Sequence, residues 1–145
     1  MAFVMVLPRR PVSVQGGPNK KYKEALSQAA AIRMQGIGML DGSLYARIIW
    51  FHRVKTSQDI DNIVKPILDS LKGVVYKDDF QIEQCLATRI DLQRSYVLSD
   101  RDVDAGTYQE IVEMIAFPYN DILYIEIGPM ALNQVVFGPI DGGVQ

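Results

Sequence analysis

The chain has 145 residues, of which 48% are hydrophobic and 22% are charged, so it is long enough to bury a core as one domain. Its single cysteine excludes an intramolecular disulfide and cysteine-rich zinc sites. No apolar stretch approaches the roughly 18 residues of a membrane helix, and the short N-terminal apolar run lacks the features of a signal peptide, which predicts a soluble, cytoplasmic protein.

The net charge is −2, which by itself argues against a nucleic-acid partner. The charges are unevenly distributed, however. Residues 1–55 hold nine Lys and Arg residues against two acidic ones, whereas the other 90 residues hold six basic and fifteen acidic ones. Such asymmetry indicates an electrostatic binding surface. A basic surface beside an acidic metal site would suit a phosphate-backbone substrate.

The first third of the chain predicts a strand, a loop, a helix and a second strand. Residues 3–7 are apolar and are followed by a proline, which favours a strand. Residues 8–19 hold three prolines and two adjacent glycines, as a loop does. An alanine-rich amphipathic helix is expected over 19–34, with Asn19 as its N-cap. The β-branched and aromatic run 43–51 is the strongest strand signal.

A second helix is predicted over 61–72, with apolar residues on one face. Pro66 would remove a hydrogen bond from the interior of that helix unless it lies in the first turn. We therefore expect the helix to begin at about residue 63, with Asp61 or Asn62 as its cap.

The rest of the chain predicts four further segments. Residues 74–76 are expected to be short and extended, and 82–90 to form a strand that includes Cys85 as a small core residue. A helix over 107–117 and an alternating strand over 122–127 follow.

An acidic cluster brackets the second helix. Asp59 and Asp61 lie just before it, Lys65 lies one turn inside it, and Asp78 and Asp79 follow it. If 59–61 is extended, both of its carboxylates point to one side and converge on one ion, which Asp79 joins from the turn after the helix. Magnesium prefers oxygen ligands and keeps several waters, and divalent metals activate water for phosphodiester hydrolysis. Lys65 could contact the scissile phosphate.

Each part of this cluster also has an ordinary structural explanation. An isolated Asp-x-Asp is usually a solvated turn or a helix cap, Asp78-Asp79 is a common polar turn, and Lys65 alone would be an exposed helix residue. His52 is interpreted as a strand-end residue, and the alternating acids at 100, 102 and 104 as a solvated loop without the rest of a calcium motif. Only the ordered combination favours a metal site.

That combination resembles the RusA family of Holliday junction resolvases. The residues that carry the resemblance are Asp59-Ile60-Asp61-Asn62, Lys65, Leu71, Gly73-Val74, Tyr76, Asp78-Asp79 and Gln81-Ile82. The close match covers about 25 residues, and the order of elements is similar over about 2–91. In one departure, Thr56-Ser57-Gln58 stand where members of the family often carry arginines.

The resemblance implies an α/β (α+β) fold in which helices pack on a mixed β-sheet. It implies a homodimeric, Mg²⁺-dependent endonuclease that cuts four-way DNA junctions, with Mn²⁺ as an alternative ion and a bacterial or phage source. The expected endonuclease domain is 1–127, with an insertion over 94–120, and 128–145 form a glycine- and proline-rich tail.

By the same resemblance, Asp59, Asp61 and Asp79 are the metal carboxylates, Lys65 is the accessory catalytic lysine and Asp78 is a further candidate ligand. The basic residues expected to contact DNA are Arg9, Arg10, Lys20, Lys21, Arg53, Lys55 and Lys77. Two other functions remain open: a branched-DNA-binding module that does not cut, and a metal-dependent hydrolase of RNA or nucleotides.

Overall fold

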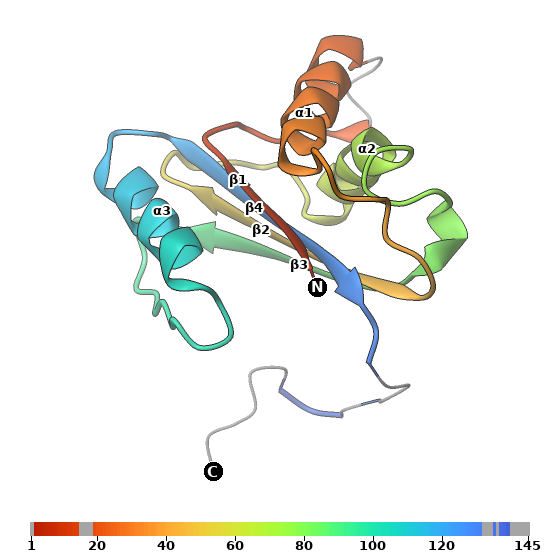
Figure 1. Cartoon of the computed structure of the whole chain (residues 1–145). Helices are drawn as coiled ribbons and strands as arrows, with labels where there is room; N and C mark the ends of the chain where they lie inside the picture. Colours follow the sequence, from red (N-terminus) through yellow and green to blue (C-terminus); the bar gives the residue numbers. More distant parts are fainter. Residues whose placement is uncertain (1, 15–18, 132–134, 136, 140–145) are drawn as a thin grey trace.

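The computed structural model of the chain describes residues 2–14, 19–131, 135 and 137–139 (Figure 1). Over these ranges it forms a four-stranded mixed sheet of order β1-β4-β2-β3, with α1 and α2 on one face and α3 on the other. β1 and β4 pair antiparallel, as do β4 and β2, whereas β2 and β3 pair parallel. The predicted α+β class with a mixed sheet is therefore confirmed.

The two inner strands form the centre of the molecule. They are β2 (Leu44–His52) and β4 (Asp121–Pro129), and the outer strands are β1 (Phe3–Leu7) and β3 (Ile82–Asp91). Ile48 and Trp50 of β2 are fully buried on the face that α1 and α2 cover. All four strands lie where the sequence predicts strands, because β-branched and aromatic residues favour a pleated surface that packs against a core.

The first helical layer is α1 (Lys20–Arg33) with α2 (Asp61–Leu71). Leu26 and Ile67, one from each helix, are fully buried in the same core cluster. Asn19 stands at the N-cap position of α1, but its side chain makes no capping hydrogen bond and its Nδ2 instead donates to the Ser13 carbonyl at 3.4 Å. The position of that cap was predicted correctly, and its chemistry was not.

Pro66 lies inside α2, so the expectation of a start near residue 63 is wrong. The helix begins at Asp61, and the residue before it, Ile60, already has helical dihedral angles and gives no side-chain cap. Pro66 removes one N–H from the second turn, but the residue is buried and its carbonyl accepts a hydrogen bond from Ser70 Oγ at 2.6 Å. Burial of the residue offsets the missing backbone bond.

The segment 74–76 forms a turn and is not a short strand. Gly73 has a φ of 86°, which a side chain would strain, and its N–H donates to the Tyr76 carbonyl at 2.7 Å. Tyr76 is fully buried, and its hydroxyl donates to the Leu68 carbonyl at 2.8 Å. The turn thus folds back on α2 because an aromatic anchor binds the helix that precedes it.

The second layer is α3 (Ala105–Ala116), which packs on the opposite face of the sheet. Its Ile111 lies in a smaller cluster with Phe51 and Tyr124. Arg53, at the end of β2, donates from Nη2 to the Ile115 carbonyl at 2.7 Å and from Nε to the Tyr119 carbonyl at 3.1 Å. The first bond satisfies a carbonyl in the last turn of α3, which a helix leaves without a partner, and the second holds the segment after the helix.

β3 is an edge strand, and this position corrects the expectation for Cys85. The cysteine is exposed on this outer strand and does not belong to the core. His52 is the last residue of β2, as predicted.

The last strand is longer than the sequence predicts, and some predicted segments are not described by the structure. β4 reaches Pro129, two residues past the predicted strand. Parts of the predicted loop and tail, at 15–18, 132–134, 136 and 140–145, lie outside the described residues. No helix in the described part of the chain is long and apolar enough to cross a membrane.

Candidate active site

The segment that carries Asp59 is held by side chains on both sides of it. On one side, Gln58 Nε2 donates to the Pro11 carbonyl at 3.3 Å, and Arg10 donates to Thr56 Oγ1 at 3.3 Å. On the other side, Arg89 of β3 donates from Nη1 to the Gln58 carbonyl at 2.8 Å. These bonds to Thr56 and Gln58 therefore fix the backbone that leads into Asp59.

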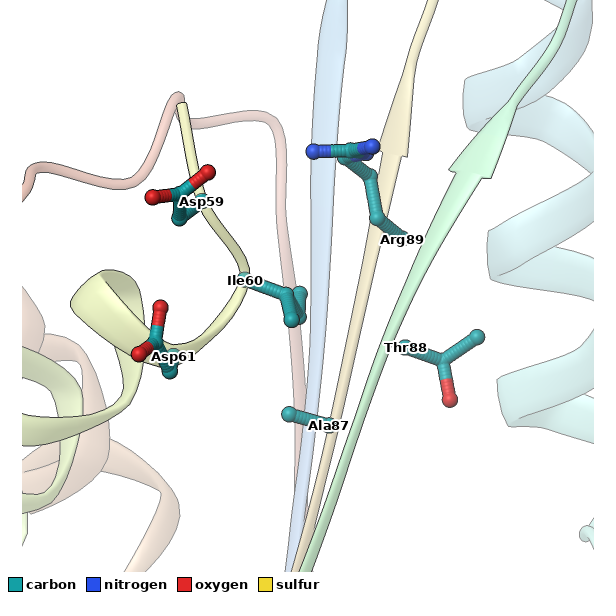
Figure 2. A pocket seen from close by; sticks show the side chains of 6 residues that line it. All are labelled: Asp59, Ile60, Asp61, Ala87, Thr88 and Arg89. Atoms are coloured by element: carbon teal, nitrogen blue, oxygen red, sulfur yellow. The ribbon is translucent and has the colours of Figure 1, made fainter. Parts of the chain in front are cut away.

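Asp59 and Asp61 line one open cavity of about 510 Å³ between the start of α2 and the edge strand β3. Ile60 lies between them, and Ala87, Thr88 and Arg89 of β3 form the opposite wall. In Figure 2 the two carboxylates lie on the same side of the cavity and the Arg89 guanidinium lies across from them. We call this cavity the acidic pocket. The structure thus brings the first acid pair together.

The reason for their convergence differs from the expected one. Residues 59–61 do not form an extended segment: Ile60 is helical and the Asn62 N–H donates to the Asp59 carbonyl at 3.3 Å. The two carboxylates reach the same cavity from the first turn of α2 and the residue just before it. A negative charge at a helix N-terminus is favoured by the helix dipole, so this turn is also a suitable place for Asp61.

Asp78 and Asp79 lie elsewhere, at the start of a short 3₁₀ helix, η2 (Asp79–Gln81). Asp78 caps it by accepting from the Phe80 N–H at 3.0 Å, and Gln81 completes a capping box. Asp79 pairs with Lys72 at 3.4 Å and is about half exposed. Neither residue lines the acidic pocket.

Lys65 is one turn along α2 from Asp61 and points into solvent, where its Nζ is 3.4 Å from Asp69 Oδ1. It does not line the acidic pocket either. The structure therefore unites Asp59 and Asp61 but leaves Lys65 and Asp79 with other partners, and the roles predicted for those two stay predictions.

Two carboxylates in one pocket fit a hard divalent cation. Mg²⁺ is bound through one or two carboxylates and keeps several waters, which matches the oxygen ligands that Asp59 and Asp61 offer. Across residues 2–14, 19–131, 135 and 137–139, no three His, Cys, Asp or Glu side chains are grouped so that they could hold a metal ion. The fit is thus to two protein ligands, and a third from η2 is not formed here.

Two of the predicted DNA-binding residues have structural partners. Arg10 lies 5.6 Å over the Trp50 ring and 3.8 Å from Asp121, and Arg53 binds the carbonyls after α3. The other five are Arg9, Lys20, Lys21, Lys55 and Lys77, all of them exposed.

Arg89 is a site residue that the sequence did not reveal. It lies in the expected strand 82–90 without any motif around it. Its position opposite the acids follows from the parallel pairing of β2 with β3, where Trp50 is opposite Arg89. The one available signal was a charged residue within an otherwise largely uncharged strand.

The fold and the acidic pocket define an α+β domain with paired carboxylates, of the kind found in nucleases that use divalent metals. The family model described as endodeoxyribonuclease RusA matches residues 9–97, and the chain belongs to that family. The match includes the acidic pocket and η2, whereas α3 and β4 lie beyond it. No curated protein matches the chain. The family implies an endonuclease that acts on Holliday junctions, as predicted.

Proposed function

We propose that this chain is a divalent-metal-dependent endonuclease that resolves four-way DNA junctions by hydrolysing phosphodiester bonds. The observation that carries the proposal is the shared cavity of Asp59 and Asp61 within the matched family region. Mg²⁺ is the expected ion, with Mn²⁺ as an alternative. A cytoplasmic site of action in a bacterium or phage-infected cell is part of the same proposal.

Asp59 and Asp61 would hold the ion, which when bound supplies activated water and stabilises charge on the phosphoryl oxygens. The protein's own residues then bind and orient the DNA. Arg89 faces the two carboxylates and fixes the backbone just before Asp59. A cation here also reduces the mutual repulsion of the acid pair.

We assign accessory roles to Lys65 and Asp79. Lys65 lies on the helical turn after Asp61 and is largely exposed, at 67% of its side chain, so it is free to approach a phosphate that replaces Asp69. Asp79 is the proposed third metal ligand, and it would exchange its pairing with Lys72 for the ion. Asp78 is already a cap, which makes it the weaker candidate of the two.

The proposed assembly is a homodimer. A junction has opposite strands related by two-fold symmetry, and a two-fold dimer would present two equivalent acidic pockets to them. The proposed endonuclease domain spans 1–127, with 94–120 as an insertion that adds α3 to the sheet.

The test is cleavage of a labelled synthetic four-way junction with and without Mg²⁺, beside a matched linear duplex and Asp61→Asn protein. We expect paired symmetric nicks that need metal and that fall by at least a hundredfold in the variant, since it loses a ligand charge. Tight junction binding without cleavage in any divalent metal would contradict the enzymatic proposal. Equal cutting of duplex and junction would contradict the junction preference alone.

A further inference from the structure

A second cavity adjoins the acidic pocket at the end of the sheet. Its volume is about 450 Å³, and it is lined by the end of β2, the segment after it, the end of β3 and residues 94–97. Arg89 lines both cavities (its place beside the acidic pocket is seen in Figure 2). A polymer bound at Asp59 and Asp61 can therefore continue past Arg89 into this second cavity.

The second cavity is basic, in a protein of net charge −2. Lys55, Arg89 and Arg94 line it and are all exposed. None of the three makes an ion pair with any other described residue. Asp91 is the one carboxylate in the lining, and it accepts a hydrogen bond from the Gln93 N–H at 2.9 Å, within the turn after β3. Lys55 and Arg94 are thus available to an anionic ligand, and Arg89 has further N–H donors besides the Nη1 that binds the Gln58 carbonyl. We call this cavity the basic pocket.

The basic pocket also has aromatic walls. Tyr96 lines it with 38% of its surface exposed. His52 is buried beside it, and its Nδ1 donates to the Val54 carbonyl at 3.0 Å, because a carbonyl can only accept; this bond fixes the ring. Cationic side chains combined with an exposed ring are typical of sites for single-stranded nucleic acid, where bases stack on the ring and phosphates meet the cations.

We propose that the basic pocket is a DNA subsite for the strand that leads away from the scissile phosphate. Lys55, Arg89 and Arg94 bind the flanking phosphates, and Tyr96 stacks on a base that has lost a stacking neighbour at the branch point. The inference rests on the proposed function. It extends that function by naming which part of the DNA is read beside the acidic pocket, and it adds Arg89, Arg94 and Tyr96 to the predicted DNA contacts.

A branched substrate suits this pocket better than a plain duplex does. Bases within a duplex are covered on both faces, so an aromatic side chain can stack only where that continuity ends. A free mononucleotide would use the ring but would leave most of the cations without phosphates.

The experiment measures binding of a fluorescent four-way junction in EDTA, so that no strand is cut, over a range of salt concentrations. Full-length Arg94→Ala and Tyr96→Ala proteins are compared with Tyr96→Phe. The matched control is Arg101→Ala, which removes an exposed arginine close by in sequence that does not line the pocket. Circular dichroism confirms that each variant is folded.

We expect the phosphate contact of Arg94 and the stacking contact of Tyr96 to differ in how they depend on salt. Arg94→Ala should reduce the slope of log K against log salt by roughly 0.7 to 0.9, the value for one phosphate contact. Tyr96→Ala should weaken junction binding by about fivefold or more without changing that slope, as loss of one stacked base does. Tyr96→Phe and Arg101→Ala should bind as the unaltered protein does.

Binding by Arg94→Ala and Tyr96→Ala that equals that of Arg101→Ala would overturn the subsite. So would an equal loss by Tyr96→Ala on linear duplex, or binding of AMP as tight as that of DNA. The proposed function can fail independently of this inference. If the variants show these binding effects but neither the unaltered protein nor Asp61→Asn cuts the junction, the subsite is supported and the nuclease proposal is contradicted.

Discussion

Asp104 shows how one side chain fixes the start of a helix. It stands at the N-cap of α3, where its carboxylate accepts from the Thr107 N–H at 2.9 Å and from Thr107 Oγ1 at 2.6 Å. Asp102 before it has a φ of 64°, so the chain turns sharply into the helix. The alternating acids that the sequence analysis assigned to a solvated loop thus include a helix cap.

This cap makes α3 sensitive to acid. The hydrogen bonds from Thr107 hold the pKa of Asp104 below its usual value, so its contribution to stability is fully present above the unfolded-state pKa of about 3.9. It is lost as the pH falls through the lowered folded-state pKa. We expect Asp104→Ala to have a lower melting temperature than the unaltered protein at pH 6. The difference between the two melting temperatures should become smaller as the pH falls below about 4. A constant difference across pH 2 to 6 would contradict this role of the carboxylate.

At the scale of single residues, the two acids of the pocket were predictable from the sequence, whereas Arg89 opposite them was not. Asp59 and Asp61 are found by their spacing and by the motif around them, because both features are local. Arg89 reaches them only through the register of β2 with β3, and sequence spacing does not encode a register that pairs Trp50 with Arg89, 39 residues later. The N-cap of α1 is a similar case. Local sequence predicts that Asn19 stands at the cap position, but its hydrogen-bond partner, the Ser13 carbonyl, depends on how the preceding loop folds.

At the scale of elements, the pairing of β2 with β4 depends on a glycine. Gly128 is opposite Tyr45, and a Cβ on Gly128 would lie 2.6 Å from the tyrosine ring. The Tyr45 and Tyr124 hydroxyls both donate to the Glu126 carboxylate. Burial, together with that carboxylate, raises the pKa of both phenols. The ring of Tyr45 therefore has a fixed place over the glycine.

Replacing this glycine should strain the sheet. Gly128→Ala pushes its methyl group into Tyr45, and we expect a loss of about 1–3 kcal/mol in the free energy of unfolding, as overpacking generally costs. Urea denaturation measures it. Gly38→Ala is the matched control, since nothing lies within 4 Å of its added Cβ and its φ is not positive. A loss no larger than that of the control would show that Tyr45 moves aside freely.

Elements with a strong periodic pattern were the predictable ones. The strands and α1 follow hydrophobic patterns that one face of the core requires. The start of α2 was misplaced because local rules exclude Pro66 from a helix interior, whereas burial of this residue in the folded chain overrides them. The segment 74–76 was wrongly predicted as extended because its apolar residues resemble a strand, whereas the turn is held by the bonds from Gly73 to Tyr76 and from Tyr76 to Leu68.

At the scale of the whole molecule, the sheet edge brings opposite charges into adjoining cavities. The acidic pocket and the basic pocket share Arg89, so a protein with a net charge of −2 still offers cations where a phosphate strand would run. The excess of basic residues in positions 1–55 predicted only part of this surface. Arg10 and Arg53 of the basic N-terminal part support the fold, whereas Arg89 and Arg94 come from the acidic remainder of the chain.

The pairing of two carboxylates in one cavity has a consequence for stability that does not involve DNA. Two adjacent negative charges repel each other, and a cation that binds only the folded state stabilises it by RT ln(1 + [L]/Kd). At a Mg²⁺ concentration about ten times its Kd this is about 1.4 kcal/mol, which corresponds to a rise in melting temperature of roughly 3 to 6 °C for a chain of this size. We expect that rise in a thermal melt when Mg²⁺ replaces EDTA at constant ionic strength.

Protein variants in the same thermal melt show which carboxylates bind the ion. Asp61→Asn should lose the rise with Mg²⁺, because it removes one of the two carboxylates that would bind the ion. Asp79→Asn should reduce the rise if η2 moves to complete the site, and should leave it unchanged if Asp59 and Asp61 alone hold the ion. Asp100→Asn, in an exposed loop, is the control for general screening. A Mg²⁺ effect that persists in Asp61→Asn would place the ion elsewhere on the molecule.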